Sequence, residues 1–231
     1  MMERARLKES IAMPKTFLID VTRCTACRGC QIACKEWHDL PANETKQTGS
    51  HQNPPDLNPY NLKIVRFNER KTSNDTVIWN FFPDQCRHCV TPICKDVADM
   101  AVPGAMIQDP KTGAVLATEK SAELSPEDAQ AVIDACPYNI PRLDPKTKRL
   151  TKCDMCIDRV SAGMLPMCVK TCPTGTMMFG ERKEILAIAQ KRLEIVKKQF
   201  PKAFLADFRD VNVIYLLGEE KEHYYEYAAF V

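Results

Sequence analysis

The chain has 231 residues, of which 45% are hydrophobic, and its 32 Lys and Arg nearly balance its 30 Asp and Glu. This length and composition allow one domain or two small ones with a buried core. The formal net charge of +2 shows neither the basic excess of a nucleic-acid-binding protein nor an acidic tail, so we expect no nucleic-acid partner. No segment has the roughly 18 to 20 consecutive apolar residues that span a bilayer. No apolar stretch follows Arg4 and Arg6 as it would in an ordinary secretory signal.

Outside the cysteine groups, the sequence shows patterns typical of strands, loops and helices. Residues 1–15 are charged and are expected to form a disordered leader. Residues 41–60 are rich in Pro, Asn and Thr and predict an ordered surface loop. The patterns predict strands at 16–22, 61–67, 76–82, 174–180 and 211–217, a hairpin-like turn at 107–117, and helices at 31–39, 125–135 and 181–200.

Twelve cysteines fall in closely spaced groups. The first group, Cys24, Cys27, Cys30 and Cys34, has the spacing C-x2-C-x2-C-x3-C, which is typical of [4Fe–4S] ligation. In two-cluster ferredoxins the last cysteine of such a run ligates the other cluster, so this group predicts a partner group elsewhere. A disulfide framework is disfavoured because neighbouring thiols of one loop pair poorly, and zinc sites favour pairs of cysteines over groups of three.

Four nested groups account for all of the cysteines if the first pairs with the fourth and the second with the third. Each cluster then takes three ligands from one group and one from its mate. This arrangement predicts three [4Fe–4S] clusters. Their ligands are Cys24, Cys27, Cys30 and Cys172 for cluster 1, Cys34, Cys153, Cys156 and Cys168 for cluster 2, and Cys86, Cys89, Cys94 and Cys136 for cluster 3.

A fourth cluster position is predicted to have lost every ligand. The nested pattern puts its four ligand positions at Ala98, Pro126, Ala129 and Val132. Because all four absences fall on one cluster, the same arrangement explains the cysteines that are present and those that are missing. An internal gap would break a relay of clusters, so the inner half should lie at one end of the electron path. The alternative that Cys34 or Cys136 is merely a buried thiol stays open at this point.

Basic side chains beside the ligands would raise the reduction potential of an anionic cluster. The candidates are Arg28, Lys35, Arg87, Lys95 and Lys152, although solvated surface charges would explain them equally well. The sequence contains no recognisable nucleophile with its base, phosphate-binding loop or pair of catalytic carboxylates. The chain is therefore predicted to carry electrons and to have no catalytic site of its own.

The predicted fold is α+β, with one ferredoxin-like half inserted in another. Residues 16–60 together with 140–180 would form the half with two clusters, and residues 61–139 the inserted half with one. Residues 181–231 would add a C-terminal helix and an aromatic tail that contacts a partner.

Between Thr16 and about Gly180 the sequence resembles the iron–sulfur electron-transfer subunits of molybdenum and tungsten bis-pyranopterin oxidoreductases. The strings TRCTACRGCQ, SHQNPPDLN, FFPDQCRHC, KCDMCIDR and CPTGTMMFG and the YYEYA tail are similar to the small β-subunit of soluble, usually periplasmic, two-subunit formate dehydrogenases. Chains of that family typically start near Met13, so the residues before it depart from the family pattern.

The resemblance implies a large catalytic partner that holds Mo or W in two pyranopterin guanine dinucleotides and interconverts formate and CO2. This chain would relay its electrons to a soluble acceptor such as a multihaem cytochrome c. The resemblance also implies a periplasmic heterodimer that is exported with the partner by the twin-arginine route. The open alternatives are a relay for a polysulfide, dimethyl sulfoxide or nitrate reductase, an autonomous polyferredoxin, and a cytoplasmic location.

Overall fold

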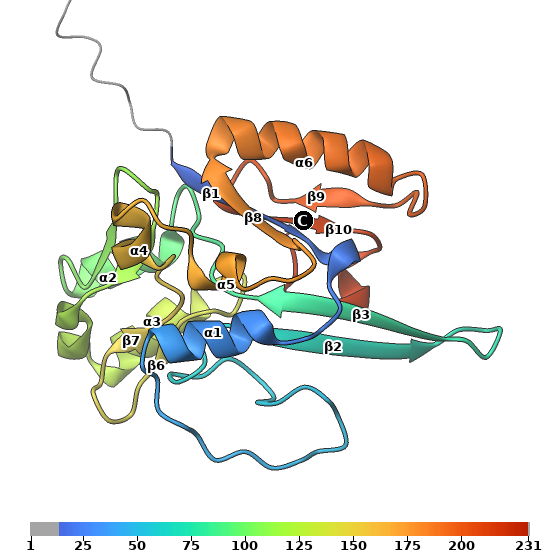
Figure 1. Ribbon diagram of the computed structural model, residues 1–231. Helices are drawn as coiled ribbons and strands as arrows, with labels where there is room; N and C mark the ends of the chain where they lie inside the picture. Colours follow the sequence, from blue (N-terminus) through green and yellow to red (C-terminus); the bar gives the residue numbers. More distant parts are fainter. Residues whose placement is uncertain (1–13, 231) are drawn as a thin grey trace, which may run out of the picture.

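The computed structural model describes residues 14–230 (Figure 1). The expected leader therefore lies outside the described residues, apart from Pro14 and Lys15. Lys15 is the first residue of strand β1 (Lys15–Asp20), so the leader was predicted one residue too long at this end. The described chain mixes helices with several small sheets, which confirms the α+β class. Within residues 14–230 no helix combines the length and the apolar character that a membrane span requires.

Every strand and helix predicted from the sequence is present, with ends shifted by a few residues. The remaining strands are β2 (Ile64–Lys71), β3 (Val77–Asp84), β4 (Met106–Gln108), β5 (Val115–Ala117), β6 (Arg142–Leu143), β7 (Leu150–Thr151), β8 (Met177–Glu181), β9 (Phe204–Ala206) and β10 (Val213–Leu217). The helices are α1 (Gly29–Trp37), α2 (Ile93–Ala101), α3 (Pro126–Asp134), α4 (Ile157–Ser161), α5 (Met167–Lys170) and α6 (Arg182–Val196). The sequence did not predict α2, α4 or α5, because each of these short helices lies within or beside a cysteine group.

The main sheet joins the beginning and the end of the described chain. Its strand order is β8-β1-β10-β9, with β1 antiparallel to β8 and parallel to β10. Phe17 lies opposite Val213 on one side and Phe179 on the other. Strand β10 belongs to the segment that we expected to be an extension. It is instead an interior strand of the sheet, and all five of its residues are buried.

Side chains of β1 and β10 alternate between two apolar cores, as the twofold repeat of a strand requires. Phe17 and Tyr215 belong to the core on the side of the cysteine loops. Leu18 and Ile214 belong to the opposite core, which helix α6 covers with side chains such as Ile185. Figure 1 shows α6 lying along the sheet on this side. Both faces of the sheet are therefore covered, which explains why all of β10 and every residue of β1 after Lys15 are buried.

The inserted half contains the predicted hairpin and a third apolar core. Strands β2 and β3 pair in antiparallel fashion from Ile64 opposite Asp84 to Lys71 opposite Val77, and their far end projects away from the main sheet (Figure 1). The third core lies between helices α2 and α3 and the short strands β4 and β5. Helix α3 begins as predicted, because the Ser125 hydroxyl accepts a hydrogen bond from the backbone N–H of Asp128 at 3.0 Å.

The aromatic tail packs against its own chain over most of its length. Tyr224, Ala228 and Ala229 belong to the core on the cysteine side of the main sheet. The Arg87 guanidinium donates a hydrogen bond to the backbone carbonyl of Tyr227 at 3.2 Å. Of the tail's apolar side chains, Phe230 is the most exposed, at 66%. The tail predicted to contact a partner therefore contributes chiefly to the internal core of this chain.

The burial of β10 can be tested by its contribution to the free energy of unfolding. Replacing Ile214, which is fully buried, by Ala should lower the free energy of unfolding by about 2–5 kcal/mol, because the change leaves a cavity between the sheet and α6. The measurement is the thermal midpoint for loss of the protein's visible absorbance under anaerobic conditions. Ile188→Ala on α6 is the control, since that side chain is 39% exposed and its loss should shift the midpoint much less. Equal shifts for the two variants would contradict the buried position of β10.

Candidate iron–sulfur sites

All twelve cysteines are free thiols, and eight of them line two small cavities, four in each. We call the four cysteines predicted for clusters 1, 2 and 3 the first, second and third quartets. The first quartet lines one small cavity beside the start of helix α1. The antiparallel pairing of β1 with β8 explains this convergence, because the first cysteine group follows β1 and the last group precedes β8.

Cys172 of the first quartet has partners that suit a thiolate. Burial alone would raise its pKa, but hydrogen bonds from the Thr174 and Thr176 side chains and from backbone N–H groups outweigh burial and lower it. The Thr174 hydroxyl lies 3.7 Å from the Cys172 sulfur. A thiolate that accepts several hydrogen bonds is the protonation state that ligates iron.

The third quartet lines a second small cavity, in the inserted half. Cys136, which stands alone in the sequence, lines this cavity together with Cys86, Cys89 and Cys94. It reaches the cavity because helix α3 ends at Asp134, two residues before it. Burial and the nearby Cys86 thiol raise the pKa of Cys136. Such mutual repulsion of neighbouring thiolates is what the positive iron of a cluster would offset.

The second quartet is recognisable from the electrostatic influence of its members on one another. Burial raises the pKa of Cys156, and the neighbouring thiols of Cys168 and Cys34 raise it further. Burial also raises the pKa of Cys153, and the nearby Cys86 thiol and Asp154 carboxylate raise it further, ahead of Cys34 and Cys168. The Cys34 sulfur lies 3.8 Å from Nδ1 of His38, and a ring nitrogen of His38 lies within 4.8 Å of the Cys156 sulfur, so these two thiols come close although they are far apart in the sequence.

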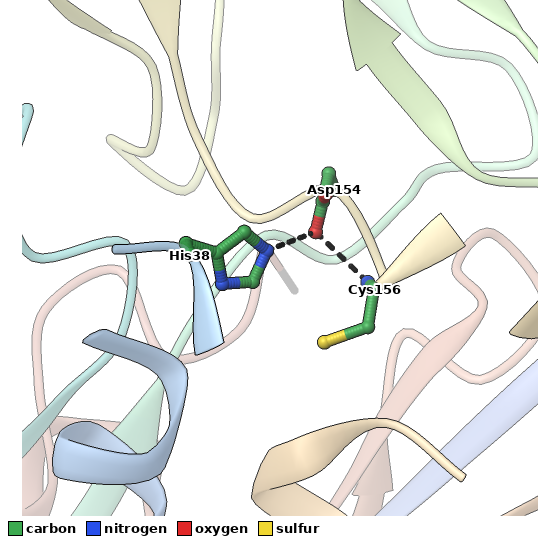
Figure 2. Close-up of side chains that lie close together, drawn as sticks. All are labelled: His38, Asp154 and Cys156. Atoms are coloured by element: carbon green, nitrogen blue, oxygen red, sulfur yellow. Dashed lines mark hydrogen bonds and ion pairs between the residues drawn. The ribbon is translucent and has the colours of Figure 1, made fainter. Parts of the chain in front are cut away.

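A histidine and an aspartate support the second quartet (Figure 2). Nε2 of His38 donates to the Asp154 carboxylate at 3.0 Å, and the same carboxylate oxygen accepts from the Cys156 backbone N–H at 2.8 Å. Nδ1 of His38 donates to the Cys34 carbonyl at 2.8 Å. Burial opposes protonation of His38, but its hydrogen bonds with Asp154 and Cys34 raise its pKa, so both ring nitrogens can donate.

His38, Asp154 and Cys156 are close enough to hold a metal ion. However, Cys156 already belongs to the second quartet. The arrangement is better explained as a brace that fixes the cysteine loop against helix α1. The sequence showed no partner for His38, because Asp154 lies in a different cysteine group.

Three of the four C-x2-C segments share a backbone feature that the sequence did not predict. The residue before the second cysteine has a positive φ in each of the three, namely 52° at Ala26, 46° at His88 and 66° at Met155. This left-handed conformation turns successive backbone N–H groups toward the inside of a loop, where they can meet a bound anion. In one loop the backbone N–H of His88 donates to the Cys86 sulfur at 3.3 Å.

Apolar side chains fill the region of the predicted lost cluster. Ala98, Ala129 and Val132 are each at most 1% exposed and belong to one apolar core, to which Cys94 also contributes. Pro126 is the first residue of helix α3. The positions that would have carried ligands now pack α2 against α3.

The predicted basic neighbours of the ligands divide into two sets. Arg87 and Lys152 line the cavity of the third quartet, and Arg28 lines that of the first. The ammonium groups of the other two have different partners. Lys35 donates to the carbonyl oxygens of residues 41 and 60 and so holds the surface loop, and Lys95 forms an ion pair with a carboxylate at position 99 on α2.

Lys63 is a functional candidate that sequence reasoning missed. It precedes β2, is only 2% exposed, and its ammonium donates to the side-chain oxygen of Gln85. Burial opposes its charge, but the nearby thiols of Cys30 and Cys168 raise its pKa. No cysteine is close to Lys63 in the sequence, so only the fold could show that thiols lie near it.

Cysteines of different quartets also influence one another. Burial raises the pKa of Cys30 in the first quartet, and the Cys168 thiol of the second raises it further. Burial likewise raises the pKa of Cys153 in the second quartet, and the Cys86 thiol of the third adds to that rise.

Groups of unpaired thiols, six of them buried and all but one at least half-buried, with cations beside them, fit [4Fe–4S] clusters and define a ferredoxin-type electron-transfer protein. The family profile described as a 4Fe-4S dicluster domain matches residues 77–182. The chain is 80% identical over 219 residues to the formate dehydrogenase 2 subunit beta (cytochrome c-553) of Nitratidesulfovibrio vulgaris, covering 95% of this chain and 100% of that protein. The chain therefore belongs to the iron–sulfur beta subunits of formate dehydrogenases, and it is the electron-transfer subunit of such an oxidoreductase.

Other relatives support this assignment. The formate dehydrogenase subunit beta of Megalodesulfovibrio gigas is 50% identical over 216 residues, with 94% of this chain and 99% of that protein covered. The iron–sulfur subunit of the nitrate-inducible formate dehydrogenase of Escherichia coli is 38% identical over 180 residues, with 78% and 58% covered. Together with the dicluster domain, the twelve cysteines account for three [4Fe–4S] clusters.

Replacing Cys136 by Ser distinguishes a cluster ligand from a merely buried thiol. If Cys136 completes the third quartet, the iron content of the anaerobically purified protein should fall from about twelve to about eight atoms per chain. Iron analysis together with electron paramagnetic resonance of the reduced protein measures this loss. Ala135→Ser is the control at the adjacent position and should retain all the iron. Full iron content in the Cys136 variant would leave that residue as a buried thiol.

Proposed function

We propose that this chain relays electrons between a catalytic subunit and a soluble acceptor through three clusters held by the first, second and third quartets. The catalytic subunit would hold Mo or W in two pyranopterin guanine dinucleotides and interconvert formate and CO2. The observation that carries the proposal is that four cysteines line each of two small cavities, while Cys34 and Cys156 of the second quartet meet at His38. A relay needs several clusters in one chain, because each transfer occurs only between neighbouring clusters.

The third quartet is proposed as the end of the relay that faces the acceptor. It lies in the inserted half, beside the apolar core that occupies the predicted fourth position. A surface groove of mixed polarity reaches it, lined among others by Cys89, Val90 and Ile93. An electron could leave through this region without crossing another part of the chain.

The acceptor is proposed to be a c-type cytochrome in the periplasm. The name of the relative that is 80% identical includes cytochrome c-553, which supports an acceptor of this class. The two chains would then be exported together, in the folded state, as a heterodimer. The choice of a c-type cytochrome is tested separately from the relay, because any soluble one-electron acceptor could use the same three clusters.

Formate should reduce the clusters of this chain in the intact complex. Anaerobic purification with the copurifying subunit should give about twelve iron atoms per copy of this chain, plus iron and Mo or W from the partner. Addition of formate should then produce the signals of reduced clusters in electron paramagnetic resonance. Iron at this level without Mo or W would favour an autonomous carrier, and zinc in place of iron would refute the cluster assignment.

Removing the third cluster should uncouple formate oxidation from delivery to the acceptor. In the complex that contains Cys136→Ser, formate should still reduce the two remaining clusters of this chain, whereas reduction of a c-type cytochrome should fall at least tenfold. Ala135→Ser should leave both reactions unchanged. Undiminished cytochrome reduction in a variant shown to lack the third cluster would contradict its place at the acceptor end.

A further inference from the structure

Two threonine hydroxyls lie beside the sulfur of Cys172, the one member of the first quartet that comes from the last cysteine group. The Thr174 hydroxyl oxygen is 3.7 Å from the Cys172 sulfur. The hydroxyl oxygens of Thr174 and Thr176 are 2.8 Å apart. Both threonines line the small cavity of the first quartet. This cavity therefore has two hydroxyl groups that contact each other, and one of them contacts a predicted ligand.

The turn after Cys172 fixes the position of the two hydroxyls. Gly175, between the threonines, has a φ of 62°, and a Cβ at this position would lie 3.2 Å from the Arg23 guanidinium. The Thr176 carbonyl accepts a hydrogen bond from the backbone N–H of Asp20, the last residue of β1, at 2.8 Å. Thr176 itself is only 1% exposed. The hydroxyl pair is thus anchored to the main sheet.

The direction of these hydrogen bonds follows from the chemistry of a cysteine ligand. A cysteine ligates iron as the thiolate, which has no proton to donate. The Thr174 hydroxyl must therefore donate its single proton to the Cys172 sulfur, and its oxygen is left to accept. The contact between the two threonines then uses the proton of Thr176. Donation runs from Thr176 to Thr174 to Cys172, an order in which the first bond strengthens the second.

The contact at Cys172 differs from the sulfur contacts of the other two quartets. Nδ1 of His38 lies 3.8 Å from the Cys34 sulfur in the second quartet, but this nitrogen already donates to the Cys34 carbonyl at 2.8 Å. In the third quartet, the donor to the Cys86 sulfur is a backbone N–H. The Thr174 hydroxyl has no carbonyl acceptor of this kind in its pair with Cys172, and a substitution can remove it without changing the backbone.

We propose that the hydroxyls of Thr174 and Thr176 raise the reduction potential of the cluster in the first quartet by donating a hydrogen bond to Cys172. This inference rests on the proposed assignment of the three quartets. A cluster with four thiolate ligands is anionic and gains a further negative charge on reduction. A donor to a ligand sulfur therefore stabilises the reduced state more than the oxidised state. The effect belongs to one cluster, because the hydroxyl contacts a ligand of the first quartet.

The test is a redox titration of the intact anaerobic complex that contains Thr174→Val, followed by electron paramagnetic resonance. Valine has nearly the same shape as threonine but lacks the hydroxyl. At a fixed ambient potential the ratio of reduced to oxidised first cluster should fall about two- to tenfold, as expected for the loss of one hydrogen bond. The signal of the first cluster is identified with Cys27→Ser, which replaces an exposed member of that quartet.

Two further variants follow the proton itself. Thr174→Ser keeps the hydroxyl and should restore the ratio of the unmodified complex. Thr176→Val removes the donor to Thr174 and should lower the ratio for the same cluster. Electron nuclear double resonance of the reduced unmodified complex should show a proton coupling at this cluster that disappears in D2O, and Thr174→Val should lack this coupling in ordinary water.

The matched control is Thr25→Val. Thr25 lines the same cavity but is exposed, so water can replace whatever its hydroxyl binds, and its loss should shift no potential. The inference is wrong if Thr174→Val leaves the first cluster unchanged, if it shifts all three clusters equally, or if Thr25→Val produces the same shift. It is also wrong if Thr174→Ser lowers the ratio as much as Thr174→Val, since the shift would then come from the turn and not from the hydroxyl.

Iron analysis separates the failure of this inference from a failure of the quartet assignment. If the unmodified complex lacks about twelve iron atoms per chain, the quartet assignment itself is wrong. If the unmodified complex has this iron but Thr174→Val loses about four atoms, the hydroxyl serves cluster assembly, and its role in setting the potential is rejected.

Discussion

The fold depends on bringing thiols from distant parts of the chain to within a few ångströms of one another. A cubane cluster needs four such ligands, and no single loop in this chain supplies all four to one site. Pairing β1 with β8 solves the problem for the first quartet, because their antiparallel register places the loop after β1 beside the loop before β8. The main sheet thus performs a binding task as well as forming a core. Strand β10 completes this sheet from within, so the last part of the chain helps to fix the position of the first cysteine group.

Charge is the second constraint, and it follows from the first. Closely packed thiolates in a dry interior repel one another, and burial raises the pKa of most of the cysteines. Buried cations, backbone N–H groups in the cysteine loops and hydroxyl donors such as that of Thr174 counteract this repulsion between thiolates. Arg87 combines this electrostatic role with a structural one. Its guanidinium lies over the ring of Tyr215, 4.5 Å from the centroid, forms an ion pair with Asp84 at 2.9 Å, and holds the tail through the carbonyl of Tyr227.

The cysteine spacing predicted the α+β class and the first and third quartets, each of which lines one cavity, because thiolate ligation imposes a strict local pattern. The N-cap at Ser125 and the β2–β3 hairpin were predicted for similar reasons, since capping and turn chemistry are also local. Lys63 and the His38–Asp154 pair were missed because their partners are remote in sequence and only the tertiary fold brings them close. The interior position of β10 was missed for a related reason. An apolar run of this length shows that a strand is buried but does not show which strands it pairs with.

Apolar side chains fill the predicted fourth cluster position. This packing explains how the inserted half can keep its fold without a cluster there. Ala98, Ala129 and Val132 replace ligand positions by side chains that pack α2 against α3, so the local fold no longer needs a metal to hold it together. The third quartet still needs this half, because Cys136 follows α3 and Cys94 lies on α2. An apolar core at this site therefore maintains the geometry of the neighbouring quartet. In the proposed relay, a cluster at one end can be replaced in this way, whereas a cluster between two others could not be lost without interrupting the electron path.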